Sequence, residues 1–85
     1  MNKIYDRIFK IDSKGKTRIW YMEQTDNMYR TWDGTQGAKI KSSEWRLAEP
    51  TNVGRSNERN GIAQATFEIE AQYKTKLEKD YHPTL

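Results

Sequence analysis

Residues 17–32 decide the fold, and their letters are TRIWYMEQTDNMYRTW. Two runs rich in aromatic and β-branched residues flank the polar trio TDN, a composition typical of a tight turn. In the first run, period-two alternation puts Trp20 and Met22 on one face and Ile19 and Tyr21 on the other. The segment therefore predicts a β-hairpin with apolar groups on both faces, made of strands Thr17–Gln24 and Met28–Trp32.

Two further strand-like segments flank this hairpin, Ile4–Ile11 before it and Lys39–Leu47 after it. Turn-forming residues at 12–16 and 33–37 separate them from the hairpin by loops of ordinary length. Within the last segment, Trp45 and Leu47 fall on one face. We expect a four-stranded antiparallel meander over residues 4–47. In it Trp20 and Trp45 are core residues, whereas Trp32 is either core or contact surface.

A C-terminal helix is predicted over residues 61–80, where apolar residues recur at helical spacing. They are Ile62, Ile69, Tyr73 and Leu77, with Ala65 and Ala71 available for close approach. Asn57 and Asn60 are candidate N-cap residues, and Pro83 prevents continuation of the helix. Residues 48–60 form a polar loop, and a loop of this length is either mobile or functional. The expected fold class is α+β, a small twisted antiparallel β-sheet of about four strands packed against one C-terminal α-helix, as a single domain over residues 1–85.

Composition argues against most catalytic chemistry. The 85 residues include no cysteine and one histidine, His82, so thiol catalysis, disulfides and cysteine-based metal sites are excluded. The acidic side chains are scattered among basic ones, without a cluster suited to Mg²⁺ or to acid–base pairing. No apolar run approaches the ~20 residues of a membrane span, and no signal peptide follows Met1. We expect a monomeric cytoplasmic protein without catalytic residues, metal or cofactor.

One short motif imitates a catalytic one. Residues 31–34 read Thr-Trp-Asp-Gly, which is similar to the Lys-x-Asp-Gly motif of nucleotidyltransferases with Thr31 in place of the lysine. A hydroxyl group at this position cannot form the phosphoramidate intermediate, so this chain alone is no nucleotidyltransferase. Asp33 and Gly34 are more simply a turn into the fourth strand.

Positive charge is concentrated in residues 1–60, which carry 12 basic and 8 acidic side chains against 3 and 4 in residues 61–85. The basic residues alternate with aromatic ones, as on surfaces that bind phosphates by charge and bases by stacking. The same lysines would also serve as solvation and edge protection. Glycines 34, 37 and 54 mark positive-φ turns or amide cradles for a phosphate. The candidate nucleic-acid-binding residues are Lys14, Lys16, Arg18, Tyr29, Arg30, Trp32, Lys39, Lys41, Arg55 and Arg59.

Nearly the whole chain resembles the WGR domain. The resemblance rests on Lys14–Trp20, Tyr29–Thr31, Ser43–Trp45 and Asn52–Glu58, on the Gly-x-x-Gly turn of Gly34 and Gly37, and on the helix end Tyr73–Tyr81. WGR domains of poly(ADP-ribose) polymerases bind DNA and recognise strand breaks near a 5′ end. WGR-like domains also occur in bacteriophage and large-virus proteins, some attached to ATP-dependent DNA ligases. This chain lacks a literal Trp-Gly-Arg, and the family tryptophan corresponds to Tyr29 or Arg30 by spacing and to Trp32 by residue type.

The resemblance implies a noncatalytic DNA-binding module that recognises nicks or DNA ends and assists a fused or separate viral DNA ligase or repair enzyme, in the host cytoplasm if phage-encoded. The basic residues would neutralise phosphates, Trp32 or Tyr29 would stack near an end, and Arg30 would support either contact. The alternative is a small viral protein-interaction module that binds or inhibits a host protein through sheet aromatics or an exposed edge strand.

Overall fold

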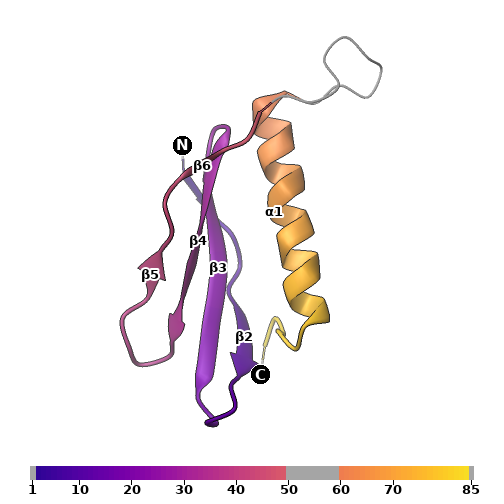
Figure 1. The fold of residues 1–85 in the computed structure, drawn as a ribbon. Coiled ribbons are helices and arrows are strands. Elements are labelled where there is room, and N and C mark those ends of the chain that lie inside the picture. The colour runs from indigo at the N-terminus through magenta and orange to yellow at the C-terminus, as the bar shows by residue number, and fades with distance from the viewer. Residues whose placement is uncertain (1, 50–59, 85) are drawn as a thin grey trace.

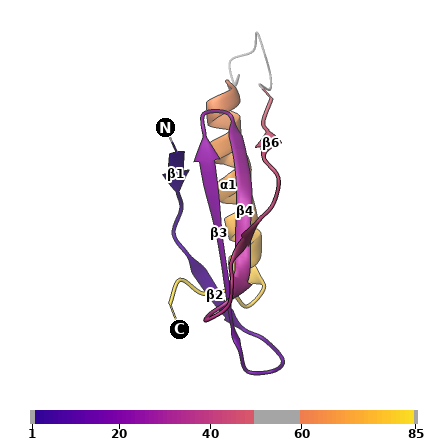
Figure 2. The same cartoon turned by 90° about the vertical axis from the view of Figure 1, so that its left-hand side faces the viewer.

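The computed structural model describes residues 2–49 and 60–84, which form an α+β fold with one antiparallel sheet and one C-terminal helix (Figure 1). The elements in chain order are β1 (Asn2–Ile4), β2 (Ile8–Ile11), β3 (Thr17–Thr25), β4 (Met28–Thr35), β5 (Lys41–Ser42), β6 (Arg46–Leu47) and α1 (Gly61–Glu78). The helix runs along one face of the sheet, behind β3 and β4 in the view of Figure 2. The predicted fold class is confirmed at this level.

The sheet has four strand positions, which we call lanes, and the chain fills them in order, as the meander prediction requires. The central lanes are β3 and β4, joined by the two-residue turn Asp26-Asn27. One outer lane contains β1 and then β2, which both pair with β3, and the other contains β5 and then β6, which both pair with β4. Each outer segment, predicted as one continuous strand, is therefore divided in two.

A β-bulge divides the first outer lane. The Tyr5 amide donates to the Met22 carbonyl at 2.8 Å, and Ile8 is the partner of Trp20. Two residues, 6 and 7, thus lie opposite the single residue Tyr21, one more than a regular ladder holds. The extra residue reverses the alternation of faces, so Tyr5 and Ile8 both face the helix although they are three positions apart.

A second bulge divides the other outer lane. Ser42 pairs with Trp32 and Arg46 pairs with Tyr29, so three residues of the outer lane face two residues of β4. The extra residue turns Trp45 to the face away from the helix, where its ring lies 4.2 Å from the guanidinium carbon of Arg30. Trp45 is therefore half-buried and lies outside the core, contrary to prediction.

The main core lies between the helix and the β3–β4 hairpin. Trp20 and Met22 contribute from β3 as predicted, with exposed fractions of 4% and 0%. Ala65 and Ile69, one helical turn apart, are the helix residues buried against them, and Tyr73 packs on the same cluster. The complete cluster is Ile8, Trp20, Met22, Tyr29, Ala48, Ala65 and Ile69.

The helix begins where its cap predicts. Of the two candidate N-cap residues, Asn60 takes the role, because its side-chain oxygen accepts a hydrogen bond from the Ala63 amide at 2.7 Å; Asn57 lies outside the described residues. Ile62 borders the β3–β4 turn beyond the core, and Leu77 lines a groove beside the first bulge. Both stay about half-exposed, which corrects their predicted burial.

Candidate nucleic-acid interface

Two loops meet at one end of the sheet, the lower end in Figure 1. Residues 12–16 connect β2 to β3, and residues 36–40 connect β4 to β5. The Gln36 amide donates to the Thr17 carbonyl at 2.8 Å, which ties the second loop to the base of the first. We call this part of the molecule, with the strand residues around it, the basic end.

The first loop is fixed by one carboxylate. Oδ1 of Asp12 accepts hydrogen bonds of 2.9 Å from the backbone amides of Lys14 and Lys16. The Lys16 amide makes the largest contribution to holding the pKa of Asp12 below its ordinary value. This carboxylate is therefore ionised at neutral pH and organises the backbone, while the two lysine side chains around it stay exposed.

The second loop differs from its predicted conformation. Asp33 and Gly34 belong to β4 and form no turn, and the reversal follows at Gly37, whose φ of +85° fits the prediction for that glycine. Gly34 has no positive φ, but a Cβ atom there would lie 3.0 Å from the Cα of Ile40, so glycine permits this close approach. Lys39 consequently lies in the loop rather than in the fourth strand.

Five of the predicted DNA-binding residues come together at the basic end. Arg18 lies opposite Thr35 and donates to its hydroxyl oxygen at 3.0 Å, and it also pairs with Asp33 at 3.7 Å. Lys41 is the strand partner of Asp33. Lys14, Lys16 and Lys39 extend from the two loops. Because Asp33 and Asp12 are both already engaged, the lysine charges are left to attract an external anion.

Sequence reasoning missed two basic residues near this end. Lys10 is the strand partner of Arg18, and its ammonium nitrogen lies 5.7 Å from the centre of the Tyr81 ring. Lys76 lies 5.4 Å from the rings of both Tyr81 and Trp20. The pairing of Lys10 could have been anticipated from a hairpin centred on residues 12–16. The position of Lys76 depends on helix packing, which no local pattern specifies.

The remaining predicted residues of β4 lie elsewhere. Arg30 and Trp32 project from the sheet face opposite the helix, which we call the open face; it also carries Tyr21, Glu23 and Trp45. The rings of Trp32 and Tyr21 are nearly parallel, at 7°, with their centres 6.1 Å apart. Arg30 lies 4.9 Å from the Trp32 ring. The open face therefore presents a group of aromatic rings with the Arg30 guanidinium among them.

Glu23 organises the open face. Its Oε1 accepts hydrogen bonds from Nε of Arg30 at 2.8 Å and from the indole nitrogen of Trp32 at 3.0 Å, while Oε2 accepts from Asn2. Burial opposes ionisation of this side chain, but the hydrogen bonds and the charge of Arg30 outweigh it and hold the pKa of Glu23 below its ordinary value. The carboxylate neutralises Arg30. Arg7, whose guanidinium lies 5.0 Å from the Tyr21 ring, is a positive charge on this face without an ion pair among the described residues.

Tyr29 is excluded as a stacking residue. It points to the opposite face from Trp32, has an exposed fraction of 3%, and its hydroxyl donates to Glu68 of the helix at 2.6 Å. Because successive residues of a strand face opposite sides, Tyr29 and Trp32, three positions apart, cannot both lie on the open face. Arg55 and Arg59, and the glycine at position 54, lie outside the described residues.

Other kinds of site were also sought among residues 2–49 and 60–84. No group of three His, Asp or Glu side chains there is arranged to hold a metal ion. Within the same ranges, no helix is long and apolar enough to cross a membrane.

Comparison with known proteins adds no relative. No protein-family model matches the chain, and no curated protein or solved structure is similar to it. The resemblance to WGR domains stays a prediction from the sequence.

Proposed function

We propose that this chain is a noncatalytic DNA-binding module that contacts phosphates with its basic end. The observation that carries the proposal is the charge of that end. Residues 10–18 and 33–41 hold six basic and two acidic side chains, and both acidic groups are engaged within the protein. A cationic surface of this kind binds the DNA backbone by releasing counterions, independently of base sequence.

Nicked or ended duplex is the form of DNA that we propose as preferred, in support of a viral DNA ligase or repair enzyme. The resemblance of the chain to WGR-like domains supports this choice. Trp32 is the aromatic side chain that we assign to stacking near an end, since Tyr29 is buried. Trp32 lies in the half of β4 that leads to the basic end, and it pairs with Ser42, the neighbour of Lys41. By alternation Lys41 faces the side of the sheet opposite Trp32, so the lysines that would meet the same DNA end as this ring are those of the two loops.

Titration of the 85-residue protein with fluorescent duplexes tests the proposal. The duplexes are intact, nicked with a 5′-phosphate, nicked without one, and single-stranded, each measured at several salt concentrations. We expect tightest binding to the nicked or ended duplex. The logarithm of the affinity should fall linearly with the logarithm of the salt concentration, by about 0.9 per phosphate contacted.

A charge-matched pair of variants locates the surface. K14Q/K39Q removes one exposed lysine from each loop, and K3Q/R46Q removes two positive charges from elsewhere in the sheet. The first variant should reduce the magnitude of the salt slope by about 1.8, the contribution of two phosphate contacts. The second should leave the slope unchanged. Equal effects of the two variants would mean that net charge alone acts, and equal weak binding to every duplex would overturn the preference for breaks.

A further inference from the structure

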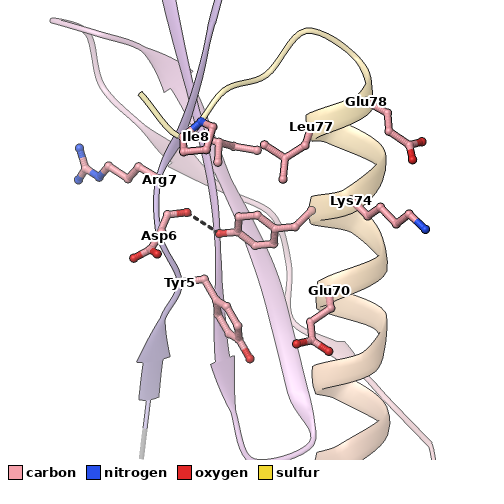
Figure 3. A pocket seen from close by; sticks show the side chains of 10 residues that line it. Tyr5, Asp6, Arg7, Ile8, Glu70, Lys74, Leu77 and Glu78 are labelled. Carbon is pink, nitrogen blue, oxygen red and sulfur yellow. Dashed lines mark hydrogen bonds between the residues drawn. The ribbon is translucent and has the colours of Figure 1, made fainter. Parts of the chain in front are cut away.

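A groove of about 830 Å³ separates the residues of the first bulge from the C-terminal half of α1 (Figure 3). Its apolar lining is Tyr5, Ile8, Tyr73, Leu77 and Pro83. The bulge produces it, because the extra residue turns Tyr5 and Ile8 to the same face. The Tyr73 hydroxyl then donates to the Asp6 carbonyl at 2.8 Å, so a tyrosine bridges the helix and the outer lane.

The groove carries negative charge on its inner side. Glu70 extends from the helix toward the strand side, near Tyr5 in Figure 3. Lys74 points outward from the helix, and the Arg7 guanidinium lies 5.0 Å from the Tyr21 ring on the open face. Glu70 forms no ion pair or hydrogen bond with another described residue. Its carboxylate is thus a charge without a counterpart among the described residues.

Two aromatic rings complete the arrangement. The rings of Tyr5 and Tyr73 lie 5.9 Å apart, tilted by 36°. The Tyr5 ring already attracts one cation, since the ammonium nitrogen of Lys3 lies 4.6 Å from its centre. Tyrosine rings beside a carboxylate are suited to a cationic side chain, whose methylene stem packs on apolar surface while its charged end meets the carboxylate.

We propose that this groove binds a partner protein through an arginine or lysine side chain, with a neighbouring apolar residue of the partner against Leu77. The charge of Glu70 selects the basic residue, and the rings with Ile8 supply the apolar contact. The site differs from the DNA surface in its charge, because it is acidic where the basic end is cationic. It does not depend on DNA binding.

Amide chemical shifts of the isotope-labelled protein test this site with two capped peptides, acetyl-Leu-Arg-Leu-amide and acetyl-Leu-Gln-Leu-amide. We expect the arginine peptide to shift the amides of residues 5–8 and 70–77. The glutamine peptide should shift them much less. In E70Q the arginine peptide should bind about two- to fivefold more weakly, the range for a partly exposed ion pair.

The control variant is E44Q, which makes the same chemical change at an exposed carboxylate away from the groove. It should bind the arginine peptide like the unchanged protein, and so should K14Q/K39Q. Equal shifts with both peptides would overturn the role of the charge. Shifts confined to other residues, or none at the highest soluble peptide concentration, would overturn the site itself.

Discussion

Tyr73 holds the first bulge together from the far side of the core. Its hydroxyl accepts from the Met22 amide at 3.0 Å and donates to the Asp6 carbonyl at 2.8 Å, two groups that the bulge removes from the regular ladder. In Y73F the fully buried Met22 amide would have no partner. We expect a loss of about 1–3 kcal/mol in the free energy of unfolding, measured by urea denaturation.

Y81F is the matched control, because Tyr81 packs on the same core but its hydroxyl makes no hydrogen bond to a described residue. Its unfolding free energy should change little. Burial raises the pKa of Tyr73 to about 12. The stability due to its neutral hydroxyl is therefore fully present below pH 10 and lost as the pH rises through 12. Burial also raises the pKa of Tyr29, so in an absorbance titration Y73F should lose one late tyrosine ionisation rather than all of them. An unchanged titration would contradict the assignment.

Glu23 makes the stability of the open face sensitive to acid. Its folded-state pKa is lowered, so the unfolded chain binds its proton first as the pH falls. The stabilisation is present above the ordinary glutamate pKa of about 4.3 and is lost below it. We expect the unfolding free energy of the protein to fall between pH 6 and pH 3 more steeply than that of E23Q, by urea denaturation at each pH. Parallel curves would show that Glu23 is not the responsible group.

At the scale of elements, the cap of α1 is the most local interaction. The Asn60 side chain satisfies the Ala63 amide, one of the amides that a helix leaves without a partner in its first turn. N60A should lower the unfolding free energy by about 1 kcal/mol, whereas N60D keeps an acceptor and should cost little. Thermal unfolding followed by circular dichroism measures both. Equal losses in the two variants would show that the hydrogen-bond acceptor of this side chain does not stabilise the helix.

Elements that depend on local patterns were the predictable ones. Turn residues and alternation located the central hairpin, and helical spacing with an asparagine cap located α1. The bulges were not predictable, since alternation assumes one residue opposite one. The first bulge is stabilised by Tyr73, which lies 51 positions from Met22 in the chain. The prediction of Trp45 as a core residue is wrong for the same reason. The inserted residue that turns Trp45 outward leaves no mark in the hydrophobic pattern.

The candidate site was predictable to the extent that it depends on loops. Lys14 and Lys16 lie in a turn, which places them at the surface whatever the rest of the fold does, whereas Lys39 lies in a loop and not in the predicted fourth strand. The faces on which strand residues lie depend on register, and there the prediction was right for some residues and wrong for others. Trp32 and Arg30 share the open face, while Tyr29, which precedes Arg30, faces the helix and is buried.

At the scale of the whole molecule, charge and aromatic surface are held apart. The basic end has exposed lysines, and the open face has rings beside Arg30, which Glu23 neutralises, and Arg7. Charge governs the salt dependence of DNA binding, whereas stacking adds affinity that salt does not screen. Variants of the basic end should therefore change the salt dependence of DNA binding, and variants of the open face should change its affinity at every salt concentration.

Replacement of Trp32 tests this separation. W32L should weaken binding to nicked or ended duplex by at least about fivefold, the lower limit for one stacked base, and leave the salt slope unchanged. W45L is the control, since Trp45 lies on the same face and also contacts Arg30. Urea denaturation would show that both variants remain folded, because W32L also removes the hydrogen bond to Glu23. Equal weakening by W45L, or a salt slope altered by W32L, would mean that Trp32 does not stack on DNA and affects binding only by changing the structure of the protein.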